Sequence, residues 1–165
     1  TELDWWESAE FGGIRLTATP AQHFSGRGIT NRNSTLWVGY AIRGAFHNVY
    51  FSGDSGYGPH FRDIGERLGP FDFTMMECGQ YNERWVAIHA MPEESVQAHI
   101  DLRGGTMMPI HWAGFQLALH TWTDPIERAT AAAKEKGVNI VTPMIGEAMK
   151  LGEYAHTERW WDQIR

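Results

Sequence analysis

After Asp54 the sequence alternates short apolar strands with helical segments, and this alternation constrains the fold most strongly. Residues 60–68 carry apolar side chains at helical spacing and are followed by an apolar run over 71–76. Pro92 begins a second helical segment that ends at Gly104-Gly105, and the apolar strand 106–110 comes next. Strands that alternate with helices are typical of a layered α/β domain.

The segments on either side of this region complete the predicted layout. The sequence before Asp54 favours strands over 2–7, 14–19, 34–42 and 47–52, which are rich in Trp, Val, Ile, Thr and Tyr. A third helix is predicted to begin with Asp124 as its N-cap, with Glu127 completing a capping box, and to end at Gly137. Closing strands are expected over 138–142 and 147–151.

Composition excludes several classes of function. The chain has 165 residues and a net charge of −6, which argues against an extended nucleic-acid-binding surface. No apolar run approaches the roughly 18 residues that a membrane span requires. The chain begins at Thr1 without a signal segment, and its single cysteine, Cys78, cannot form an internal disulfide. We therefore expect a reducing, cytoplasmic location.

Three metal-competent side chains directly follow predicted strands. His23 follows the strand 14–19, Asp54 follows 47–52, and His111 follows 106–110. Ligands gather at strand ends in layered α/β folds, so these residues are candidates for one zinc-type site. Taken singly, a histidine after a strand is more often a hydrogen-bonded structural residue, and Asp54 alone is typical of a turn. The hypothesis rests on all three converging.

Four runs of the sequence carry a resemblance to a known family. TPAQHFSGRG, VYFSGDSGYGPHF, HAMPEESVQAH and MMPIHWAGF occur in this order and lie within roughly residues 2–151. They resemble the metallo-β-lactamase superfamily, and within it the branch of N-acylphosphatidylethanolamine-hydrolysing phospholipase D. The resemblance implies a four-layer αββα sandwich that carries two metal ions, usually zinc.

The resemblance also implies roles for individual residues. His23 matches a ligand of the first metal, Asp54 the carboxylate that bridges both metals, and His111 a ligand of the second. His89 matches a histidine placed beside the site for contact with the substrate or leaving group. The implied reaction is attack of a metal-bridging hydroxide on a phosphodiester, for which Asp54 and His89 are the catalytic candidates.

The sequence departs from the family pattern in one major respect. The chain contains no H-x-H-x-D-H string, which supplies the other metal ligands in the family. Residues 1–165 therefore resemble the C-terminal half of the sandwich, with the upstream half absent. Two smaller departures are Glu77, where relatives often have Pro, and Gln80, where they often have Ala.

Two further functions stay open. The same fold also hosts lactonases and other ester hydrolases, and a half-domain can act as a non-catalytic binding or assembly module. The expected partners are a small-molecule or lipid phosphodiester substrate and either a second copy of the chain or the missing half. Because half a sandwich leaves an apolar sheet face uncovered, we expect self-association and weak or absent metal binding by this chain alone.

Overall fold

The computed structural model describes residues 1–26, 28–115, 117–153 and 159–164. Within these residues, seven strands form one sheet, and their order across the sheet is their order along the chain. Neighbours from β1 to β4 are antiparallel, whereas neighbours from β4 to β7 are parallel. The strands are β1 (Ser8–Phe11), β2 (Ile14–Pro20), β3 (Val38–Arg43), β4 (Asn48–Phe51), β5 (Phe71–Glu77), β6 (Gly104–Ile110) and β7 (Asn139–Ile140).

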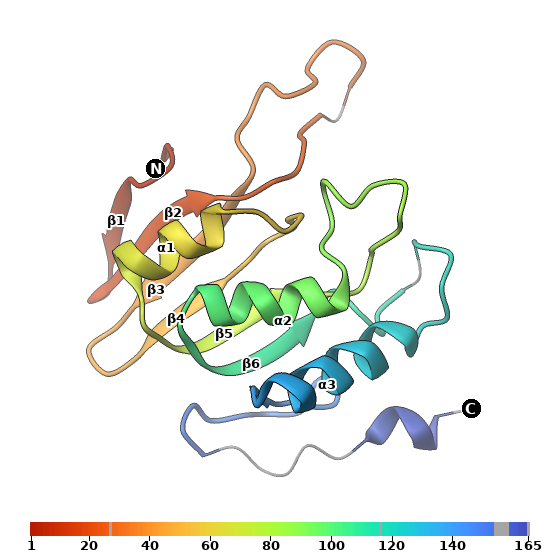
Figure 1. Ribbon diagram of the computed structural model, residues 1–165. Helices are drawn as coiled ribbons and strands as arrows, with labels where there is room; N and C mark the ends of the chain where they lie inside the picture. Colours follow the sequence, from red (N-terminus) through yellow and green to blue (C-terminus); the bar gives the residue numbers. More distant parts are fainter. Residues whose placement is uncertain (27, 116, 154–158, 165) are drawn as a thin grey trace.

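Helices connect the parallel strands and lie together on one face of the sheet (Figure 1). They are α1 (His60–Leu68), α2 (Pro92–Asp101) and α3 (Asp124–Lys136), followed by a short 3-10 helix, η1 (Trp160–Gln163). Parallel neighbours need such crossovers, because a tight turn cannot return the chain to the same end of the sheet. The helix predicted over 60–68 from the spacing of apolar residues has the bounds observed for α1.

The core lies between the sheet and the helices. Tyr50 of β4 and Met107 of β6 belong to one buried cluster with Phe61 of α1 and Val96 of α2. The strand register places Ala41, Tyr50, Thr74 and Met107 in one row on this face. The α/β class predicted from the sequence is thus confirmed, since one mixed sheet carries one layer of helices.

The opposite face of the sheet is apolar but incompletely covered. Register pairs Leu16 with Ile42 and Ile42 with Val49 in one row, and Tyr40 with Phe51 in the next. All five of these side chains are only half-buried. This is the surface on which a second sheet packs in the four-layer sandwich that the resemblance implies.

Two predicted strands were wrong. Residues 2–7 form a turn instead, because Asp4 Oδ1 accepts the Trp5 N–H and the Asp4 carbonyl accepts the Glu7 N–H. Residues 147–151 also form no strand, since turns with Gly146 and Gly152 at positive φ leave only a bridge between Lys150 and Glu153.

The predicted cap of α3 was wrong as well. Thr123 occupies the N-cap position without a side-chain cap, and Asp124 lies inside the helix. Asp124 instead accepts the Tyr81 hydroxyl, while Glu127 binds Arg159 and Trp161. Both side chains of the expected capping box thus bind residues that are distant in sequence or lie outside the helix. Gly137, in the left-handed conformation, ends the helix as predicted.

The helices of the described residues are too short or too polar to cross a lipid bilayer.

Candidate metal centre

Three adjacent parallel strands each deliver one potential metal ligand to the same edge of the sheet. Asp54 follows β4, Glu77 ends β5 and His111 follows β6. Because β4, β5 and β6 are parallel neighbours, their carboxyl ends lie side by side. The sheet therefore brings Asp54 and His111 together, as the sequence predicts, and adds Glu77 to the group.

The distances within this group are short. His111 Nδ1 lies 2.9 Å from Asp54 Oδ1 and 3.3 Å from Glu77 Oε2. One ligand atom from each residue lies within 4.8 Å of the other two. A carboxylate pair with an imidazole nitrogen is a donor set suited to zinc or another borderline divalent ion. The residues present therefore fit the metal that the family implies.

The charges of the group are mutually dependent. Burial alone would lower the pKa of His111, but its hydrogen bonds to Asp54 and Glu77 raise that pKa to about 9. The hydrogen bond from His111 in turn lowers the pKa of Asp54, against the opposing effect of burial. Without a metal, a proton on His111 thus supplies the positive charge between two carboxylates.

Close backbone packing fixes the Asp54 loop. Gly53 has φ +61°, and a Cβ there would lie 2.4 Å from the Val38 carbonyl oxygen, so only glycine fits. Ser52 Oγ accepts the Glu77 N–H at 3.0 Å, and Ser55 Oγ accepts the Gln22 N–H at 2.9 Å. The two serines therefore tie the loop to β5 and to the segment that carries His23.

The His111 loop is held by Gln80. Gln80 Nε2 donates to the His111 carbonyl at 3.1 Å, while its Oε1 accepts the N–H groups of Leu117 and Ala118. His111 itself has φ +64°, a conformation that costs a non-glycine residue about 1–3 kcal/mol. Surrounding packing must hold such a conformation, and strain of this kind is typical of functional positions.

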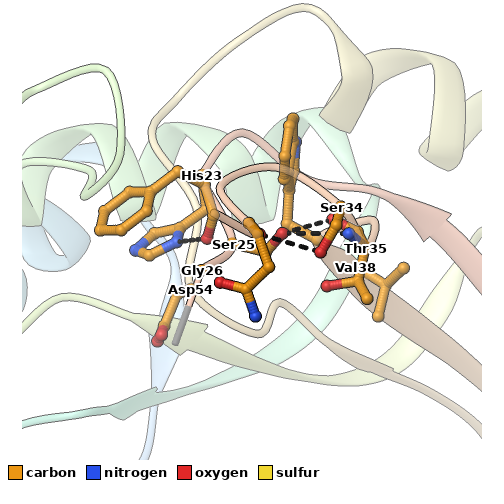
Figure 2. Close-up of a pocket in the computed structure, with 10 residues that line it drawn as sticks. His23, Ser25, Gly26, Ser34, Thr35, Val38 and Asp54 are labelled. Atoms are coloured by element: carbon orange, nitrogen blue, oxygen red, sulfur yellow. Dashed lines mark hydrogen bonds between the residues drawn. The ribbon is translucent and has the colours of Figure 1, made fainter. Parts of the chain in front are cut away.

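His23 lies beside the group but outside it. Its Nδ1 donates to the Phe24 carbonyl at 2.8 Å, which leaves Nε2 as the free ring nitrogen. His23 and Asp54 lie at the same end of a pocket of about 720 Å³, with Ser34 and Thr35 at the other end and Ser25 between them (Figure 2). The position fits a ligand of a neighbouring metal ion.

His89 approaches the site from the loop between β5 and α2. Its ring packs edge-on against His23 with 5.1 Å between centroids. Its Nδ1 donates to the Glu77 carboxylate at 2.9 Å. From the sequence, Glu77 is only a departure from the family pattern. Glu77 directly follows the predicted strand 71–76, just as Asp54 and His111 follow theirs, and this shared position is the signal that would have made it a candidate.

A second, mostly apolar pocket also adjoins the centre. It has a volume of about 640 Å³ and reaches His23, Asp54, His89 and His111. Its apolar walls come from the loops after β2, before α2 and after β6. They include Phe24, Trp85, Ile88, Trp112, Phe115 and Leu117. The two pockets share His23, Phe24 and Asp54, so both open onto the centre.

Several other polar or titratable side chains are engaged elsewhere. The hydroxyls of Tyr57 and Tyr81 donate to Asp101 and Asp124, away from the centre. His99 is buried in the core, where its Nδ1 lies 2.8 Å from the Thr74 hydroxyl oxygen. Arg27 lies outside the described residues, and Cys78 is buried with its pKa raised by burial.

Comparison with known proteins identifies relatives along the whole chain. Residues 1–112 match the model of the β-lactamase superfamily domain. An uncharacterized protein of Mycobacterium tuberculosis is 42% identical over 163 residues, which are 97% of this chain and 44% of that protein. N-acyl-phosphatidylethanolamine-hydrolyzing phospholipase D 1 of Caenorhabditis elegans is 35% identical over 159 residues, covering 89% of this chain and 45% of the enzyme.

The fold is also found among solved structures. Igni18, a metallo hydrolase from Ignicoccus hospitalis, superposes with a TM-score of 0.65 at 20% identity, covering 93% of this chain and 58% of that protein. This chain spans about 44–45% of the length of the mycobacterial and nematode relatives.

Proposed function

This chain belongs to the family of β-lactamase superfamily domains, and on that premise we propose that it forms the C-terminal half of a metal-dependent phosphodiester hydrolase. The observation that carries the proposal is the convergence of Asp54, Glu77 and His111 from three parallel strand ends. An upstream half would supply the remaining ligands, in keeping with the share of its relatives that the chain spans.

Two divalent ions, zinc in this proposal, would when bound supply a water that ionises near neutral pH and would offset developing negative charge. Asp54 would hold both ions, while His23 and His111 would each bind one. Asp54 is exposed and therefore accessible to ions. The glycine turn at Gly53 and the two flanking serines would keep its carboxylate in place.

His89 would contact the substrate. It lines the apolar pocket next to Asp54 and His111, so a group bound there lies beside the proposed metals. The nematode relative is named for hydrolysis of an N-acyl-phosphatidylethanolamine, and the apolar pocket would accept acyl chains of such a lipid. A lipid phosphodiester is therefore the proposed substrate.

We also propose a reducing, cytoplasmic location. Cys78, which is buried and unpaired, supports it.

The test compares this chain with a longer form that includes an upstream H-x-H-x-D-H segment. Bound metal is counted by elemental analysis, and hydrolysis is measured with vesicles containing N-acylphosphatidylethanolamine, with a simple phosphodiester and with a lactone. We expect two metals and phosphodiester hydrolysis only in the longer form. Turnover of the lactone alone would replace the proposed substrate class with the lactonase alternative.

Variants of the longer form assign the site. Asp54→Ala should lose metal and activity, whereas Asp72→Ala, an exposed carboxylate near the start of β5, should keep both. Two bound metals and full activity in Asp54→Ala would refute the ligand assignment. A longer form that binds no metal would instead favour the non-catalytic assembly module.

A further inference from the structure

Glu77 is a buried carboxylate that the family pattern does not explain. It is 2% exposed, and burying a charged carboxylate is costly unless hydrogen bonds satisfy its oxygens. Its backbone is fixed as well: Ser52 Oγ accepts its N–H at 3.0 Å, and its carbonyl accepts the Ser95 hydroxyl. A side chain held this firmly by strand β5 and helix α2 is suited to orient a neighbour.

The hydrogen bonds of the Glu77 carboxylate point mainly at the His89 segment. Oε2 lies 2.9 Å and Oε1 3.0 Å from His89 Nδ1, and Oε1 also accepts the Ala90 N–H at 3.1 Å. The contact to His111 Nδ1 is longer, at 3.3 Å. Both oxygens are thus engaged by one short segment, which leaves Glu77 less free than exposed Asp54 to bind a metal.

This geometry has a consequence for the His89 ring. With Nδ1 donating to a carboxylate, the neutral imidazole carries its proton on Nδ1 and keeps a lone pair on Nε2. That is the opposite of the tautomer that free histidine prefers. No described residue forms a hydrogen bond with Nε2, and the ring lines the apolar pocket beside Asp54 and His111.

We propose that Glu77 is a positioning residue that fixes the ring and tautomer of His89, so that Nε2 is the atom presented to the substrate. The proposal rests on the hydrolase function argued above, because only a bound substrate gives Nε2 a partner. Glu77 acts through His89 in the way that carboxylates orient histidines around metal sites. It thereby adds a residue beyond the ligands to the machinery of this centre.

The direct test is histidine side-chain NMR of this chain at mildly alkaline pH, where the tautomer of each ring is read from its two nitrogen shifts. We expect His89 to carry its proton on Nδ1. A His89 ring with its proton on Nε2 would overturn the proposal. This measurement needs neither metal nor turnover, so it stands even if the hydrolase function fails.

Two substitutions at Glu77 test whether its carboxylate acts on His89 as a hydrogen-bond acceptor or only fills space in the core. Glu77→Met keeps the volume but removes both acceptors, so His89 should move to the Nε2-protonated tautomer. Glu77→Gln keeps one acceptor oxygen and should retain part of the Nδ1-protonated population. Asp72→Asn, on the same strand beside His47, should leave His89 unchanged. An unaltered His89 in a folded Glu77→Met variant would contradict the proposal.

Zinc titration and kinetics distinguish positioning from metal binding. In the longer form, Glu77→Met should retain its metals and lower kcat by about 10–100-fold with little change in KM. Loss of metal from Glu77→Met would overturn the proposal in favour of a ligand role. If the longer form proves inactive with every substrate, the hydrolase function fails while the tautomer result still decides what Glu77 does to His89.

Discussion

His111 Nδ1 lies 2.9 Å from Asp54 Oδ1, although the two residues are 57 positions apart and follow strands that are not neighbours. Strand β5 lies between β4 and β6, and the carboxylate of its last residue, Glu77, lies 3.3 Å from the same His111 Nδ1. The candidate centre therefore depends on how three parallel strands end, and on how closely the loops that follow them pack.

Gly79 allows the loop after β5 to pack closely against the loop after β6. A Cβ at this position would come within 1.7 Å of the His111 carbonyl oxygen, which is backbone and cannot turn aside. We expect Gly79→Ala to lower the free energy of unfolding by about 1–3 kcal/mol and to separate His111 from Asp54. Urea denaturation followed by circular dichroism measures the first effect.

Gly114 provides the matched control. A Cβ there meets nothing within 4 Å, so Gly114→Ala should stay within about 1 kcal/mol of the wild type. Equal stability of the two variants would show that the close approach at Gly79 is not a constraint.

His99 should make stability depend on pH. Burial lowers its pKa to about 4, from 6.5 for the unfolded residue. As the pH falls, the unfolded chain therefore takes up a proton on His99 before the folded protein does. The stability that neutral His99 gives the folded state is complete above about pH 6.5 and is lost as the pH falls toward 4. The loss amounts to about 3 kcal/mol at most. Urea unfolding at a series of pH values measures it.

His99→Asn retains a side-chain acceptor for the Thr74 hydroxyl but cannot titrate in this range. Its stability should fall less steeply between neutral pH and pH 4 than that of the wild type. Parallel curves for the two proteins would rule out His99 as the source of the acid sensitivity.

Trp160 belongs to a second buried cluster, which packs against Trp112 next to the site. It stacks on Trp112, which directly follows His111, with 5.2 Å between ring centroids, and it is 6% exposed. We expect Trp160→Ala to cost about 3–5 kcal/mol in unfolding free energy. Trp160→Phe keeps an aromatic ring and should cost clearly less. The thermal denaturation midpoint distinguishes them, and equal losses would exclude packing against Trp112 as the main contribution.

The uncovered sheet face should drive self-association of this chain. Val49 lies at its centre between Ile42 and Phe73 in the register, and it is half-buried. We expect multi-angle light scattering to show oligomers, and Val49→Lys to shift them toward monomers. Glu66→Lys on the exposed side of α1 serves as the charge control. A monodisperse wild-type monomer at high concentration would contradict the expectation.

Local patterns predicted much of the fold because the relevant interactions are local. The helical spacing of Phe61, Ile64 and Leu68 predicted α1, and Gly137 was correctly predicted to end α3. The strand over residues 2–7 failed because Asp4 forms a turn with its own neighbours. The α3 capping box failed because Tyr81 and Arg159, distant in sequence, bind the side chains that would have formed it.

By itself, the sequence determined the α/β class, the strand-end positions of His23, Asp54 and His111, and the resemblance that assigns them roles. Only the tertiary structure decided that Glu77 lies among them and that its oxygens face His89 and His111. The physical reason is that strand order is a long-range property. The residues of β5, FDFTMME, do not indicate that this strand lies between β4 and β6. Its position between them is what brings the buried end of β5 to the metal centre.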